Sequence, residues 1–141
     1  MSYFVKFTVG AMTLAAPLQE VKEIARPTTV TKKERASRNL AGCFKLRGKS
    51  VPLFDLPRLF ESSTTERFEV IVSEISTVLI GFKVDSVSGV LSAEVVKSIP
   101  ALASTARFMQ GVIQEGENIV QVLSLKKLVS GPRLRSIKRY M

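Results

Sequence analysis

Residues 42–60 contain the pattern that most restricts the fold, which is a strand, a tight turn, a second strand and a short helix. Apolar residues alternate before Arg47 and resume at Val51, so the turn is centred on Arg47 and Gly48. A two-residue turn between strands needs positive φ angles, which glycine adopts at little cost. Asp55 then stands where its carboxylate can accept the free amides of a helical turn. The stretch therefore predicts a β-hairpin followed by a capped helical turn.

The pattern recurs in the second half of the chain. The spacing is 69 residues for three pairs: Gly42 with Gly111, Asp55 with Ser124, and Leu59 with Leu128. The leading strands recur with a spacing of 66, as in Val9 and Ile75. We interpret this as an internal repeat, with one half over 1–61, the other over 66–130, and a polar boundary at 62–66. Repeated short hairpins predict an all-β fold of two small barrels, with strand exchange between the halves left open.

Single strands can be oriented from their alternation. Tyr3, Val5 and Phe7 share one face of the first strand, and Phe4 lies on the other, which predicts a half-buried strand. The start of the chain reads as a strand and no apolar run reaches membrane-spanning length, so we expect a cytoplasmic protein. Spacing also predicts that Ile24 faces the core.

Composition argues against catalysis. The chain has no histidine, one cysteine and two aspartates, Asp55 and Asp85, which disfavours a zinc site. Asp55 recurs as Ser124, which suits a helix cap and not a general acid. Cys43 lies in an apolar strand and is expected to be a small buried side chain. The sequence thus predicts no enzyme activity, no cofactor and no bound metal.

The central motif resembles the signature GxxNLRGxxVPxxDLxxxF of the CheW family of bacterial chemotaxis adaptors. The matching residues are Gly42, Leu46-Arg47-Gly48, Val51-Pro52, Asp55-Leu56 and Phe60, while Lys45 stands where the signature has asparagine. Further matches at 21–24, 80–87 and 111–112 extend the resemblance over nearly the whole chain.

The resemblance implies a single domain over 1–141, built from two SH3-like five-stranded β-barrels with a groove between them and a short helical turn after each second hairpin. It implies a non-catalytic adaptor that couples chemoreceptors (methyl-accepting chemotaxis proteins) to the histidine kinase CheA, in receptor clusters at the inner face of the membrane. The positions that it implies for receptor binding are Val21, Glu23, Arg47, Gly48 and Gly81. For the regulatory domain of the kinase, we expect exposed aliphatic residues at one barrel end, including Val30 and Leu40.

Charge leaves alternatives open. The chain has 21 Lys and Arg against 12 Asp and Glu, a net charge of +9, concentrated at 32–49 and 126–141. These regions are compatible with a solvated surface and a frayed basic tail over 131–141, with acidic partners, or with an anionic membrane surface. The alternative functions are an adaptor of a related motility pathway, pilus-driven or gliding, and a nucleic-acid-binding β-barrel. Aromatic residues at only 7% disfavour nucleic acid.

Overall fold

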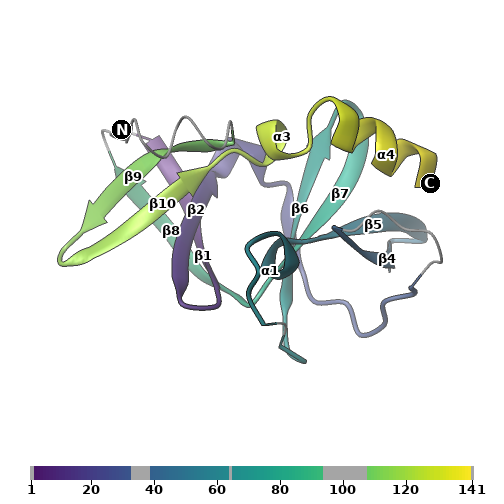
Figure 1. Cartoon of the computed structure of the whole chain (residues 1–141), viewed down its shortest axis with the longest axis horizontal. Coiled ribbons are helices and arrows are strands. Elements are labelled where there is room, and N and C mark those ends of the chain that lie inside the picture. The colour runs from purple at the N-terminus through teal and green to yellow at the C-terminus, as the bar shows by residue number, and fades with distance from the viewer. Residues whose placement is uncertain (1, 33–38, 64, 94–107, 141) are drawn as a thin grey trace.

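The computed structural model describes residues 2–32, 39–63, 65–93 and 108–140, and these form two five-stranded sheets (Figure 1). The first sheet has the order β8-β1-β2-β10-β9 and contains β1 (Ser2–Val9), β2 (Met12–Pro17), β8 (Ser86–Ala93), β9 (Met109–Glu115) and β10 (Asn118–Leu123). The second has the order β3-β6-β7-β5-β4 and contains β3 (Glu23–Ala25), β4 (Leu40–Leu46), β5 (Lys49–Asp55), β6 (Glu69–Ile75) and β7 (Val78–Val84). The helices are η1 (Leu18–Glu20), α1 (Leu56–Leu59), α3 (Leu125–Leu128) and α4 (Pro132–Tyr140). The predicted all-β fold with two five-stranded units is confirmed.

Each sheet combines strands from both sides of the polar segment 62–66. Hairpin β1–β2 occupies the centre of the first sheet, between β8 and β10. Hairpin β6–β7 occupies the centre of the second, between β3 and β5. The joints within the sheets are parallel pairs, β2 with β10 and β5 with β7, and the other pairs are antiparallel. Among the described strands, each five-stranded sheet therefore needs both halves of the chain.

Turns and caps follow the local chemistry of the sequence. Arg47 and Gly48 form the β4–β5 turn with φ angles of 48° and 82°, and Gly116 in the β9–β10 turn has a φ of 62°. The side chains of Asp55 and Ser124 each accept a hydrogen bond from the amide three residues later, at 3.1 and 3.2 Å. These caps begin α1 and α3, so the predicted helical turns after each second hairpin are confirmed.

Three apolar cores hold the structure together. The largest lies between the two sheets and takes residues from both, including Phe7 of β1 and Phe82 of β7. Each sheet also encloses a smaller core on its other face. Phe4 belongs to the core of the first sheet and is 6% exposed, so the prediction that only one face of β1 is buried was wrong. Tyr3, expected inside, is 54% exposed.

The two smaller cores use positions related by the sequence repeat. The equivalent pairs, first sheet then second, are Phe4 and Val70, Ala15 and Gly81, Ile113 and Phe44, Val120 and Val51, and Val122 and Leu53. Side-chain volume is distributed differently in the two cores. The second core has the larger Phe44 in place of Ile113 and the smaller Gly81 in place of Ala15. A Cβ atom on Gly81 would lie 2.6 Å from Cε1 of Phe44 and 2.8 Å from Cγ1 of Val70. Gly81 therefore makes room for the phenylalanine ring.

The C-terminal basic segment is helical. Residues 132–140 form α4, and Ile137 on this helix is 2% exposed in the core between the sheets. Nη1 of Arg133 donates a hydrogen bond of 3.1 Å to the carbonyl of Leu128, which joins α4 to the end of α3. Over these residues the interpretation as a frayed tail was wrong, because the segment has an apolar side that packs. No helix of the described residues is long and apolar enough to cross a membrane.

We expect Gly81→Ala to lower the free energy of unfolding by about 1–3 kcal/mol, because the added methyl group overpacks the second core. Phe44→Ile should partly rescue this variant, since it recreates the alanine and isoleucine pair of the first core. Urea unfolding of the wild type, both single variants and the double variant measures this coupling. Additive losses in the double variant would show that Gly81 does not make room for Phe44.

Candidate functional site

An ion pair connects the two edge strands of the second sheet. Glu23 lies in β3 at one edge, and Arg47 lies in the turn that follows β4 at the other. The guanidinium binds the carboxylate through two hydrogen bonds, Nη1 to Oε2 at 3.0 Å and Nη2 to Oε1 at 2.7 Å. The side chains are 29% exposed for Glu23 and 65% for Arg47, so the pair is accessible to a partner. Its two-point geometry fixes the orientation of both groups.

Backbone contacts hold the same two edges together. The chain after β3 runs beside β4, where Thr31 and Cys43 exchange two hydrogen bonds, with N to O distances of 2.8 and 2.9 Å. Gly42 permits this approach, because a Cβ atom on it would meet the carbonyl oxygen of Thr31 at 2.4 Å. Cys43 is buried at 4% exposure, as predicted. The position of Glu23 relative to Arg47 thus has support from the main chain.

The other residues expected at the receptor surface lie in different environments. Gly48 is exposed beside Arg47, with no atoms within 4 Å of the position of a Cβ. Val21 is half-buried against the core between the sheets, two residues before Glu23. Gly81 is buried against Phe44 and lies in the same row of the sheet as Glu23, separated from it by Val72 of β6. Its packing explains the glycine, and a receptor contact at Gly81 stays a prediction.

Comparison with known proteins identifies the family. The family model described as CheW-like domain matches residues 3–133. The chain belongs to the CheW-like family. It is 30% identical over 138 residues to "Chemotaxis protein CheW" of Klebsiella aerogenes, covering 93% of this chain and 83% of that protein. It is 24% identical over 133 residues to "Probable chemotaxis protein CheW" of Rhizobium etli, with coverages of 89% and 86%.

Two further comparisons extend this result. "Protein FrzA" of Myxococcus xanthus is 26% identical over 144 residues, covering 96% of this chain and 90% of that protein. The crystal structure of the scaffolding protein TtCheW from Thermoanaerobacter tengcongensis superposes with a TM-score of 0.82 at 20% identity, covering 94% and 90% of the two chains. The structural match shows a shared fold. The family match and the relatives named CheW identify this chain as a coupling adaptor of chemotaxis signalling.

The aliphatic residues expected at a kinase surface are less exposed than predicted. Leu40 is 4% exposed in the core between the sheets, so the expectation that it lies on the surface was wrong. Val30 is half-buried against the core of the second sheet. Ile24, expected in the core, is 37% exposed on the edge strand β3.

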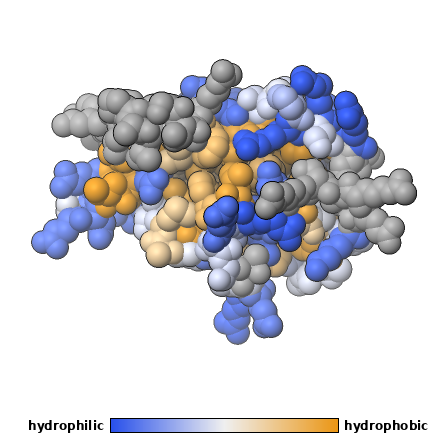
Figure 2. All heavy atoms as spheres, in the orientation of Figure 1, coloured by the Kyte–Doolittle hydropathy of each residue, from blue (hydrophilic) through white to orange (hydrophobic). Residues whose placement is uncertain are grey.

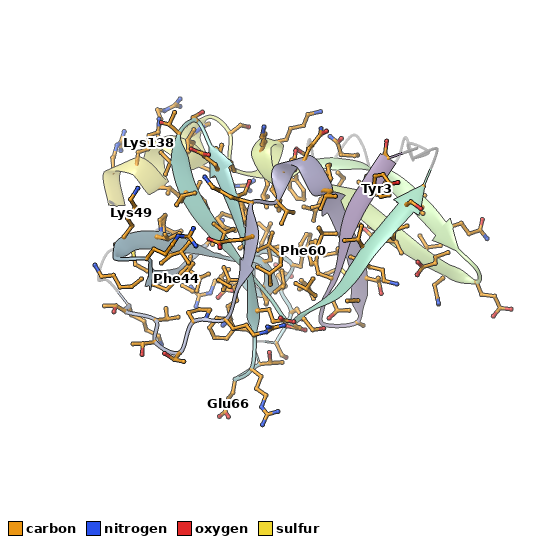
Figure 3. The ribbon with its side chains drawn as sticks, turned by 180° about the vertical axis from the view of Figure 1, so that it is seen from behind. Tyr3, Phe44, Lys49, Phe60, Glu66 and Lys138 are labelled. Carbon is orange, nitrogen blue, oxygen red and sulfur yellow. The ribbon has the colours of Figure 1, made fainter. Side chains whose placement is uncertain are left out.

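A different apolar surface lies on the first sheet, and sequence reasoning missed it. Tyr3 is 54% and Leu18 41% exposed, and with Phe4 and Pro17 they line a hollow of about 480 Å³. Figure 3 shows Tyr3 at the opposite end of the molecule from Lys49. The exposure of Leu18 could have been predicted from Pro17, because a proline ends the strand before it. The exposure of Tyr3 could not, because the alternation of β1 places it on the same face as buried residues. Apolar side chains are also exposed across the middle of the face in Figure 2.

The ion pair changes the titration of both its members. The hydrogen bonds from Arg47 lower the pKa of Glu23 from its ordinary value of 4.5, and the positive charges of Arg47 and Lys22 act in the same direction. The carboxylate in turn raises the pKa of Arg47. Because the folded pKa of Glu23 is lowered, its contribution to stability is present above the ordinary carboxyl pKa. That contribution is lost as the pH falls through the folded value.

We expect Arg47→Ala to raise the pKa of Glu23 towards its ordinary value, because the variant removes the charged hydrogen-bond donor. The carboxyl carbon resonance of Glu23, followed by NMR from neutral to acid pH, measures this shift. Arg67→Ala is a matched control, since Arg67 is also exposed and takes no part in this pair. A pKa of Glu23 that does not respond to Arg47→Ala would show that the pair does not persist in solution.

Proposed function

We propose that this CheW-like protein binds chemoreceptors and a CheA-type histidine kinase through two separate surfaces, and holds them in one complex without catalysing a reaction. The proposed place is the cytoplasmic receptor cluster at the inner face of the membrane. Family membership over residues 3–133 supports the coupling role. The observation that carries the assignment of the surfaces is the separation of the exposed Glu23–Arg47 pair from the apolar hollow at Tyr3.

The receptor surface is assigned to the pair and its neighbours. Arg47 and Glu23 satisfy each other in the free protein, so a partner meets a polar unit with no net charge. Unused donor and acceptor positions on both groups stay open to a receptor helix, and Gly48 allows the main chain of that helix to approach. Val21 adds an apolar contact next to the pair. Polar groups beside an apolar contact are suited to binding an amphipathic helix in a groove.

We expect Arg47→Ala to weaken binding to a chemoreceptor signalling fragment by roughly ten- to a hundredfold, because the receptor loses the open guanidinium donors and Glu23 is left without its partner. The thermal midpoint should change little, since the side chain is mostly exposed. Titration calorimetry and thermal unfolding on one preparation measure both effects. Arg67→Ala is the matched control and should bind as the wild type does. Unchanged receptor affinity, or a loss that follows unfolding, would remove Arg47 from the receptor surface.

The kinase surface is assigned to the apolar hollow on the first sheet. Exposed aromatic and aliphatic side chains that line a concavity are typical of residues that dominate binding free energies. Tyr3 and Leu18 meet this description, and none of the described residues that line the hollow is charged. Val30 stays a second, smaller proposal for a kinase contact because it is partly accessible.

We expect Tyr3→Ser and Leu18→Ser to weaken binding to the kinase regulatory domain at low and at moderate salt, because the lost contact is apolar. Receptor binding should be unchanged. Ile119→Ser is the matched control, since Ile119 is 61% exposed but does not line the hollow. Kinase binding that disappears at moderate salt and ignores both substitutions would assign the kinase to a charged surface instead.

Two further functions are separated by one pull-down experiment. An adaptor of a related motility pathway is the second candidate, because FrzA of Myxococcus xanthus is among the relatives. A nucleic-acid-binding protein is the third, on the net charge of +9. The purified chain is tested against chemoreceptor fragments, the kinase regulatory domain and random nucleic acid. Retention of nucleic acid alone would overturn the coupling role.

A further inference from the structure

The last two helices carry a concentration of positive charge that the proposed function does not use. The six basic residues from 126 onward are exposed, and no acidic residue occurs among them. We call these residues the basic helical face: Lys126, Lys127, Arg133, Arg135, Lys138 and Arg139. Figure 1 shows α3 and α4 following one another along one side of the molecule, with α4 ending beside the second sheet.

These charges are not neutralised within the described part of the chain. Arg133 donates to the carbonyl of Leu128, and the side chains of the other five form no hydrogen bond or ion pair with any residue that the structure describes. The ion pairs of the described residues use basic residues elsewhere on the surface, such as Lys6 with Glu115. Helix dipoles account for part of the pattern, because Lys138 and Arg139 lie in the last turn of α4. Arg135 lies before that turn, where the dipole gives no such stabilisation.

The packing of α4 determines which charges point outward. Leu134 is half-buried and Ile137 is buried, so these two residues define the inner side of the helix. At about 100° per residue, Arg135 and Arg139 then lie on the outer side, roughly 6 Å apart along the axis. Carboxylates spaced four residues apart on another helix have the same separation. The outer side of α4 therefore matches a row of acidic residues on a helix.

We propose that the basic helical face binds an acidic α-helical segment of a partner protein. A membrane surface fits less well, since the apolar residues that would insert, Leu134 and Ile137, are packed inside. Single-stranded nucleic acid fits less well because aromatic residues, on which bases stack, make up only 7% of the chain. The face contains none of the residues assigned to receptor or kinase above, so the inference stands apart from those assignments.

The test uses a labelled alanine-based peptide with glutamates spaced four residues apart, and its binding to the full chain is measured by fluorescence anisotropy at low salt. Arg135→Gln with Arg139→Gln should weaken binding about tenfold, because two charged contacts are lost. Lys32→Gln with Arg67→Gln removes the same charge from exposed positions elsewhere and should change affinity by less than about threefold. Circular dichroism verifies that both variants are folded.

A second peptide of equal charge, interrupted by prolines so that it cannot form a helix, should bind several-fold more weakly. The inference is overturned if the control variant loses as much affinity as the test variant, since net charge alone would then explain binding. It is also overturned if the proline peptide binds equally well. A short DNA duplex or vesicles rich in phosphatidylglycerol that bind more tightly than the helical peptide, with the same loss in the test variant, would assign the face to nucleic acid or membrane instead.

Discussion

The apolar core between the two sheets determines the rest of the structure, because it buries the face of each sheet that the smaller core of that sheet does not cover. Phe54 and Phe82 illustrate this, with ring centroids 5.7 Å apart on neighbouring parallel strands of the second sheet. The hairpin at the centre of each sheet comes from the other half of the chain than its flanking strands, so the two halves cannot separate without breaking strand pairs in both sheets. Both sheets must therefore fold together. The edges that carry Glu23 and Arg47 are positioned by the same core, which orders the pair before any partner binds.

Where the two halves of the chain differ at a helix N-terminus, a residue distant in the sequence supplies the missing group. Each short helix has a carboxylate at its N-terminus, where it interacts favourably with the free amides. For α1 this group is Asp55 itself. For α3 the equivalent residue is Ser124, and Glu20 supplies the carboxylate, accepting bonds of 2.7 Å from both the Ser124 hydroxyl and the Leu125 amide. Glu20 ends η1, the short helix that follows β2, and is 9% exposed, so this contact also fixes the first hairpin against the end of the second half.

Features that depend on adjacent residues could be predicted from the sequence, including the turn at Arg47 and Gly48 and the caps at Asp55 and Ser124. Features that depend on tertiary partners could not. Alternation shows which residues share a face, but it does not show whether the second face meets another sheet, which is why the burial of Phe4 was missed. Leu40 was placed on the surface because it borders a polar loop, although its side chain reaches the core between the sheets. Glu23 and Arg47 were both identified, but as separate partner contacts, since their pairing depends on two sheet edges 24 residues apart in the chain.

The pairing also restricts how a partner can use Arg47. A receptor carboxylate that took the place of Glu23 would gain two charged hydrogen bonds, but it would leave Glu23 without its donor and beside a new negative charge. A receptor that bound the intact pair would leave both charges compensated and would contact only their outer atoms. Because the pKa of Glu23 is lowered and that of Arg47 is raised, both groups stay ionised around neutral pH, and protonation cannot favour displacement there. For the proposed receptor contact, electrostatics therefore favour recognition of Glu23 and Arg47 as one unit, and the role proposed for Glu23 is to hold the guanidinium in place.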